Sequence, residues 1–138
     1  MNISLDDRQQ IMDLVSRYNM ANDHVEPGAW AETFADDGVL IVNGQEIARG
    51  KSALIAHLSK RSGAGTPKLR HWTTNLLIAG DGSSARLRAY VMAFRIEDSL
   101  GPPYIMGEYD DTLLKIEGSW KFKIRHMTVV AGTSTTGR

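Results

Sequence analysis

Asp23 and His71 are a carboxylate and an imidazole that could share one reaction, although they lie far apart in the sequence. A carboxylate that is hydrogen-bonded to an imidazole fixes its tautomer and stabilises its protonated form. The other ring nitrogen is then a base that works near neutral pH. Such a pair suits removal of a carbon-bound proton, the first event in dehydration, elimination or double-bond migration. This hypothesis requires that the fold bring the two side chains into contact.

Each residue of this pair also has an ordinary structural interpretation. Asp23 falls at the end of a predicted helix, where a carboxylate costs roughly 0.3–1 kcal/mol against the helix dipole. It could be there as a turn residue before Pro27. A histidine on a strand is more often a satisfied core residue than a catalyst. Among the other histidines, His24 adjoins Asp23 but should diverge from it, while His57 and His126 suit a helix edge and a packed strand.

The segment around His71 reads as a strand over residues 70–78. Side chains alternate along a strand, so one face would carry His71, Thr73, Asn75 and Leu77, and the other Trp72, Thr74, Leu76 and Ile78. Both faces carry bulky apolar residues. We therefore expect a central strand that is covered on both sides, with His71 largely buried.

Further polar side chains could bind the substrate or stabilise a developing anion, namely Tyr18, Asn75, Tyr109 and Arg125. Tyr18 belongs to the apolar stripe of the first helix, so its ring should face the sheet. Arg125 lies on a half-apolar strand face and should pair with an acid, Asp111 or Asp110. That role could be structural only.

Tryptophan and methionine add apolar surface to the candidate site. Trp30, among three tryptophans and six methionines, would suit a pocket that accepts an aromatic molecule, although such residues most often form ordinary core. Tyr109 shares a strand face with Gly107, and a glycine there permits a bulge or a close approach. We therefore assign Trp30 and Tyr109 to a predicted apolar pocket.

Helical periodicity governs the first part of the chain. Ser4 followed by Asp7 has the form of a capping box. Apolar residues then recur at helical spacing and predict a helix over residues 5–22. Tyr18 is the last member of this stripe. We expect the helix to end at about residue 22, just before Asp23.

Two further helices are predicted before residue 62. Pro27 suits the first turn of one of them, with Trp30 and Phe34 as its buried edge and residues 36–38 as its end. Another should run over residues 50–61, because its apolar positions again follow helical spacing. Between them, a two-residue Asn-Gly turn predicts a short hairpin.

The remainder of the chain reads as long strands. They are predicted over residues 68–79, 84–96, 104–116 and 120–130. Helices first and strands later indicate an α+β fold, in which helices pack on the inner side of a curved sheet and leave a conical cavity. We expect one domain over residues 1–130, followed by a flexible polar tail over residues 131–138.

Composition excludes several classes of function. The 138 residues balance to a formal net charge of +0, which gives no long-range attraction to nucleic acid or to anionic membrane. There is no cysteine, so thiolate chemistry and cysteine-bound metals are excluded. The polar start of the chain is unlike a secretory signal, and no apolar run reaches membrane-spanning length. A soluble, cytoplasmic protein is expected.

The order of these motifs resembles the SnoaL-like branch of the NTF2-like superfamily, whose fold is a cystatin-like α+β cone. The matching pieces are Arg17-Tyr18, Ala21-Asn22-Asp23, Trp30, Phe34 to Gly38, Gly50, His71, Asn75, Gly107 to Asp111, Gly118-Ser119-Trp120 and Arg125. The resemblance covers nearly the whole chain except the tail. It implies N-terminal helices on a curved antiparallel or mixed sheet that encloses a pocket.

The resemblance also implies roles for individual residues. Asp23 and His71 match the catalytic pair of the scytalone dehydratase and hexachlorocyclohexane dehydrochlorinase branches, as orienting carboxylate and base. Arg125 falls where the latter has an arginine for the leaving group or substrate. Tyr18 stands where that enzyme has a pocket lysine, and Asn22 where the scytalone enzyme has a tyrosine, so neither reaction is reproduced in full.

These considerations lead to one preferred function and one alternative. We expect a cofactor-independent lyase or isomerase, without a metal, that acts on a small, largely apolar cyclic or aromatic molecule. Its base would be His71, supported by Asp23, and its binding residues Tyr18, Trp30, Asn75, Tyr109 and Arg125. The alternative is a non-catalytic ligand-binding module or an oxygenase small subunit. The resemblance implies a homotrimer or a homodimer, with a slight preference for the trimer.

Overall fold

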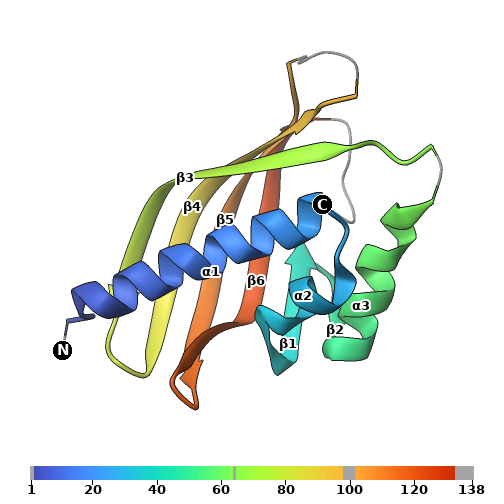
Figure 1. The fold of residues 1–138 in the computed structure, drawn as a ribbon. Coiled ribbons are helices and arrows are strands. Elements are labelled where there is room, and N and C mark those ends of the chain that lie inside the picture. Colours follow the sequence, from blue (N-terminus) through green and yellow to red (C-terminus); the bar gives the residue numbers. More distant parts are fainter. Residues whose placement is uncertain (1, 64, 98–101, 133–138) are drawn as a thin grey trace.

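The computed structural model describes residues 2–63, 65–97 and 102–132, and Figure 1 shows their arrangement. Helices and strands follow in the order α1 (Leu5–Asp23), α2 (Pro27–Glu32), β1 (Phe34–Val42), β2 (Gln45–Arg49), α3 (Lys51–Ser59), β3 (Leu69–Gly80), β4 (Ser84–Arg95), β5 (Pro103–Ile116) and β6 (Ser119–Gly132). A 3₁₀ turn (Lys60–Ser62) follows α3. The helices pack on one curved sheet, so the predicted α+β fold is confirmed.

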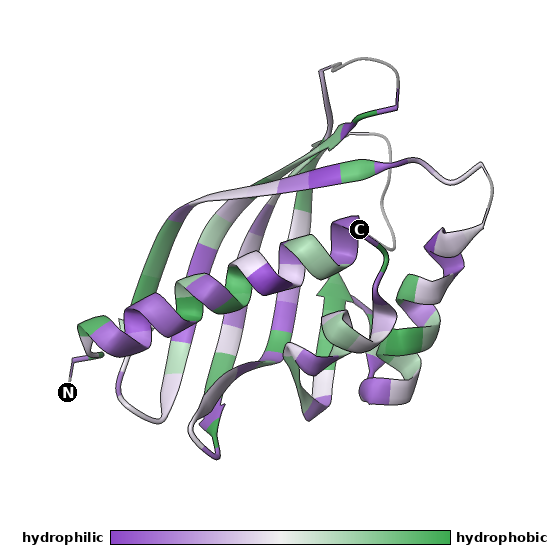
Figure 2. Cartoon of the chain, in the orientation of Figure 1, coloured by the Kyte–Doolittle hydropathy of each residue, from purple (hydrophilic) through white to green (hydrophobic). Residues whose placement is uncertain are grey.

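The sheet contains the strands in the order β2-β1-β6-β5-β4-β3. Neighbouring strands are antiparallel except β1 and β6, which are parallel. The sheet is therefore mixed and open, and α1 lies across its concave side (Figure 1). Hydrophilic and hydrophobic bands alternate along α1, as expected for a helix with one face on the sheet (Figure 2).

Strand β3 forms one edge of the sheet, so the prediction of a central strand is wrong. Trp72, on its outer face, is 57% exposed. Its ring packs on Phe94 of β4, with centroids 5.1 Å apart, and not on a second layer. The bulky Trp72 on the outer face of β3 is therefore explained by its contact with Phe94 on the same face, and not by a layer that covers the strand.

The second helix is shorter than predicted, because α2 ends at Glu32 and Phe34 begins β1. The hydroxyl of Thr33 donates to Trp30 O at 2.6 Å, and Phe122 N donates to Thr33 O at 2.9 Å, which ties the turn to β6. Trp30 and Phe34 still pack together, with ring centroids 5.3 Å apart. Their contact crosses from helix to strand and does not follow one helix face.

Helix α1 is held at both of its ends by polar contacts. At its start, Ser4 Oγ accepts from Asp7 N at 3.0 Å, which confirms this half of the predicted cap. The Asp7 carboxylate accepts from Trp120 Nε1 at 2.9 Å and from Lys115 Nζ at 3.0 Å. These bonds fix the start of α1 against the β5–β6 hairpin. At its end, the carboxylate of Asp23 accepts from the backbone N–H of His71 in β3.

Strand β6 extends beyond the predicted end of the domain. Gly132 pairs with Ile105 and Ala131 with Met106, so these two residues belong to the sheet and not to a tail. The predicted flexibility of residues 133–138 lies outside the described residues. Within the described part of the chain, none of the helices combines the length and the apolar character that crossing a membrane requires.

Candidate active site

The structure brings Asp23 and His71 into direct contact. The ring Nδ1 of His71 donates to Asp23 Oδ1 at 2.5 Å, and the backbone N–H of His71 lies 3.1 Å from both carboxylate oxygens. Both side chains are nearly inaccessible, with 3% of His71 and 6% of Asp23 exposed. The carboxylate therefore orients the ring and the strand together.

Local structure explains why Asp23 reaches the strand. Helix α1 stops directly after it, because Val25 takes a left-handed backbone conformation with φ 52°. His24 turns away, and its Nδ1 donates to Met20 O at 2.8 Å. The expected divergence of His24 from Asp23 is thus confirmed. His71 lies near the start of β3, one of the strands that contact α1.

The Nε2 atom of His71 is buried and has no hydrogen-bond partner among the described residues. Because Nδ1 donates to Asp23, the neutral ring carries its lone pair on Nε2. A buried polar atom without a partner is uncommon in folded proteins and calls for an explanation. A base that awaits a proton from a bound molecule is one such explanation.

Asn19 is a member of this site that the sequence reasoning missed. Its Nδ2 donates to Thr73 Oγ1 at 2.9 Å, while its Oδ1 is buried without a hydrogen-bond partner among the described residues. Its spacing of four from Asp23 places both on one face of α1, which is the signal that could have found it. Asn19, Asp23, His71 and Thr73 all line a groove of about 510 Å³ between α1 and β3.

Arg125 forms a second cluster within the core. It is fully buried, and its guanidinium carbon lies 3.4 Å from the ring centroid of Tyr109 and 4.2 Å from that of Tyr18. Its Nε is 3.3 Å from Asp111 Oδ2, so Asp111 is its acid partner, while Asp110 instead binds Arg86. Cation–π contacts of this kind stabilise a desolvated guanidinium.

Burial perturbs the ionisable groups around Arg125. It raises the pKa of Asp111 to about 7, against the opposing effect of the Arg125 cation. It also raises the pKa of Tyr18 and of Tyr109, so both phenols remain protonated at neutral pH. The negative charge of Asp23 contributes to the raised pKa of Tyr109. The two clusters are therefore within electrostatic range of each other.

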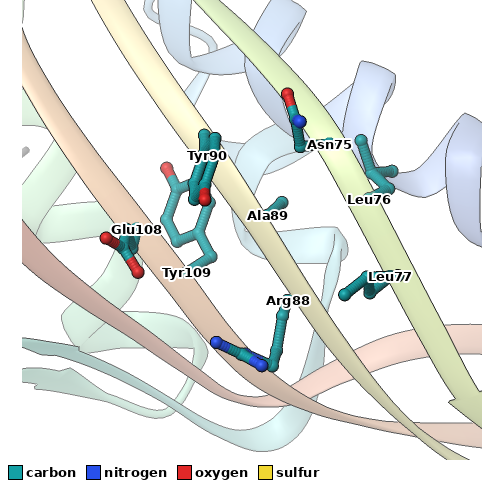
Figure 3. A pocket seen from close by; sticks show the side chains of 8 residues that line it. All are labelled: Asn75, Leu76, Leu77, Arg88, Ala89, Tyr90, Glu108 and Tyr109. Carbon is teal, nitrogen blue, oxygen red and sulfur yellow. The ribbon is translucent and has the colours of Figure 1, made fainter.

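Asn75 does not join either cluster, which corrects its predicted place beside His71. It is exposed, has φ 59°, and lies in a bulge where Thr74 pairs with Tyr90 but Leu77 with Arg88. The extra residue reverses the alternation, so that Leu76 packs against the core and Leu77 is exposed. Asn75 and Tyr109 do line one separate pocket of about 300 Å³ (Figure 3).

Trp30 joins the cluster that Tyr18 and Tyr109 form around Arg125. Its ring packs on Tyr18 at 5.6 Å between centroids and on His57 of α3 at 6.0 Å. Its Nε1 is buried without a hydrogen-bond partner among the described residues. Within the same residues, no three histidine, cysteine or carboxylate side chains gather closely enough to hold a metal ion.

An open α+β cone with this arrangement defines the NTF2-like, cystatin-like class of proteins. Residues 4–126 match the model of the SnoaL-like domain. The chain therefore belongs to the SnoaL-like domain family. None of the curated proteins matches the chain.

Solved structures with the same fold include three that match more than nine-tenths of this chain. A protein of unknown function with a cystatin-like fold from Nostoc punctiforme is 26% identical, with TM-score 0.83 over 94% of this chain and 95% of that one. Rv3472 from Mycobacterium tuberculosis, also of unknown function, is 28% identical, with TM-score 0.83 over 91% and 77%. A candidate scytalone dehydratase from Novosphingobium aromaticivorans is 27% identical, with TM-score 0.76 over 97% and 89%.

Proposed function

We propose that this protein is a cofactor-independent lyase or isomerase that removes a carbon-bound proton from a small, largely apolar cyclic or aromatic molecule. The observation that carries the proposal is the buried Asp23–His71 contact of 2.5 Å, together with a His71 Nε2 atom that has no hydrogen-bond partner among the described residues. The candidate scytalone dehydratase among the similar structures supports a dehydratase-type reaction.

In the proposed reaction, His71 Nε2 accepts the proton and Asp23 stabilises the resulting imidazolium. The electron pair left on carbon forms a double bond, either by expelling a leaving group from the neighbouring carbon or by delocalising and taking a proton elsewhere. Donors are needed for the negative charge that develops. We assign this role to Tyr18, Tyr109 and Arg125, which form one contiguous cluster.

The test is to replace each member of the dyad and measure proton removal. Asp23→Asn and His71→Gln should each lower turnover of a responsive cyclic or aromatic compound by about 10²–10⁴-fold, the range for loss of a positioned general base. Proton exchange with deuterated solvent, followed by NMR, detects the first step for any panel compound with an acidic C–H bond. The folded state of each variant is checked by its amide NMR spectrum.

His24→Gln is the matched control, because His24 adjoins Asp23 but its ring binds Met20 O. It should leave turnover unchanged. The ¹⁵N shifts of His71 should also report a ring protonated on Nδ1. Near-wild-type turnover in either dyad variant would refute the proposal.

A non-catalytic ligand-binding or accessory module is the second candidate. The observation in its favour is the aromatic packing between helices and sheet, where Tyr18 contacts Phe34 and Phe122 at 6.0 and 5.5 Å between centroids. The same panel separates the two functions. A binding module would retain ligands without exchanging their protons, and the dyad variants would not change that behaviour.

A further inference from the structure

Val25 is the residue at which the chain leaves α1, and its type is unexpected at this position. Its φ is 52°, and glycine or asparagine is the usual residue in the left-handed position after a helix. A β-branched side chain is an outlier in this conformation, because its Cβ is crowded against the following carbonyl oxygen. The chain therefore carries local strain two residues after Asp23, the carboxylate of the dyad.

The hydrogen bonds around Val25 are those of a complete Schellman motif. The N–H of Glu26 donates to Ala21 O at 2.9 Å. The N–H of Val25 donates to Asn22 O at 3.1 Å. In this motif a left-handed residue lets both N–H groups turn back onto the last turn of the helix. The bonds require the backbone conformation at residue 25 but not the valine side chain, because glycine would form them without the crowding.

The side chain of Val25 makes a contact that glycine would lack. It is partly buried and packs against the hydrophobic core, whereas the side chains of His24 and Glu26 on either side of it are exposed. Of these three residues, Val25 therefore provides the apolar contact that fixes the turn after α1 to the body of the protein.

The position of Asp23 depends on this turn. Asp23 is the last residue of α1, and its carboxylate accepts from the ring Nδ1 of His71 at 2.5 Å and from the backbone N–H of His71 at 3.1 Å. A carboxylate at this end of a helix faces the negative pole of the helix dipole, so the helix itself does not favour it. Hydrogen bonds weaken steeply away from their preferred geometry, so a small rotation of the last helical turn would disturb both contacts.

We propose that Val25 is a positioning residue for the Asp23–His71 pair. Its side chain, packed against the core, holds the end of α1 at the angle that directs the Asp23 carboxylate to β3. Strained conformations persist where the surrounding structure over-determines them, and they are concentrated at functional sites. The inference deepens the proposed function and rests on it for the claim that turnover depends on Val25. The claim about the geometry of the pair is independent of catalysis.

Val25→Gly tests the proposal, because glycine keeps the left-handed turn and removes the apolar contact. Its urea midpoint should stay close to that of wild type, since relief of strain offsets the lost packing. The contact between Asp23 and His71 should nevertheless loosen. We expect the His71 amide to exchange with deuterated solvent about tenfold faster. Removal of the C1 proton of 2-tetralone, a bicyclic carbon acid, should slow about tenfold in kcat with little change in KM.

Two further variants serve as controls. Val25→Ile keeps the β-branched apolar side chain and should retain both the protection of the His71 amide and the turnover of wild type. Glu117→Gly is the matched control, because Glu117 is exposed and has φ 50° in the turn between β5 and β6. This hairpin contacts the start of α1 through Asp7, at the opposite end of the helix from Asp23. Glu117→Gly should change neither amide exchange at His71 nor turnover.

Unchanged exchange of the His71 amide in Val25→Gly would overturn the proposal. Equally faster exchange of amides throughout the sheet would also overturn it, because that result would indicate general destabilisation. Faster exchange at His71 alone, in a protein whose wild type removes no proton from 2-tetralone, would support the positioning role and count against the proposed function. Conversely, if Asp23→Asn abolishes turnover while Val25→Gly behaves as wild type, the dyad stands and the positioning role is refuted.

Discussion

The Asp111–Arg125 pair illustrates how single residues in this fold depend on their surroundings. Both side chains are completely buried, and their contact is 3.3 Å between Oδ2 and Nε. Desolvation penalises both charges, while Tyr18, Tyr109 and the backbone N–H of His126 compensate in part. Asp7 differs, because hydrogen bonds from Trp120 and Lys115 hold the pKa of its carboxyl below the ordinary value. The two carboxylates therefore have opposite effects on stability as pH changes.

The first residue-scale prediction concerns Asp111. Its pKa is about 7 in the folded protein against an ordinary value of 3.8, so the folded state binds the proton more tightly. The contribution of this group to stability is therefore full at pH below 3.8 and is lost as pH rises towards 7. Asp111→Asn, which cannot ionise, should gain stability relative to wild type across this window.

Urea unfolding at a series of pH values measures this difference. Taking the difference between variant and wild type removes the opposite contribution of Asp7, which is lost as pH falls. The relative stability of Asp111→Asn should rise with pH and then level off above about pH 7. A relative stability that falls with pH would mean that Arg125 keeps the carboxylate ionised.

Among the elements, β5 and β6 show how a close approach of strands is built. Their register shifts between Met106 and Gly107, as expected from a glycine at this position. A Cβ on Gly107 would lie 2.8 Å from Met127 Cε and 3.0 Å from Thr128 O. The methionine end can move, but the backbone carbonyl of the neighbouring strand cannot move without disturbing the ladder.

We therefore expect Gly107→Ala to destabilise the protein by about 1–3 kcal/mol, the usual cost of overpacking. Denaturant unfolding measures the change. Gly82→Ala is the matched control, because a Cβ there would meet nothing within 4 Å. Equal stability of the two variants would show that β5 and β6 separate easily at this point.

For the whole molecule, the outer face of the sheet is the surface that the fold leaves uncovered. Large apolar side chains are exposed there, with Tyr90 at 50%, Met106 at 41% and Val130 at 55%. Charged residues such as Arg86 and Asp110 occupy the other end of the same strands and pair with each other. An apolar area of this kind is often covered by a second copy of the chain.

The homotrimer or homodimer implied by the family resemblance remains a prediction. Sedimentation equilibrium should give two or three times the chain mass of 15.2 kDa. Met106→Glu should shift the protein towards the monomer, because a charge in a covered apolar face is costly. Leu5→Glu, at an 84% exposed position on α1, should not. A monomeric wild type would contradict the prediction.

The sequence by itself determined the α+β class, the order of the elements and the Asp23–His71 pair. Each of these depended on local signals: the periodicity of α1, a helix end at Asp23, and a strand that begins near His71. The resemblance to the SnoaL-like family could also be read from the sequence alone, because it depends on the order and spacing of motifs along the chain. It implied that Asp23 and His71 lie close together.

Tertiary structure decided the place of Asn75, the role of Phe34 and the edge position of β3. A single inserted residue at the Asn75 bulge moves each later side chain of β3 to the opposite face of the sheet. The residues next to Asn75 in the sequence give no signal for this bulge. Phe34 belongs to β1 because β6 supplies its hydrogen-bonding partner from far along the chain. Strand order and face depend on such non-local pairings, whereas helix periodicity and turn chemistry depend on neighbours in the sequence.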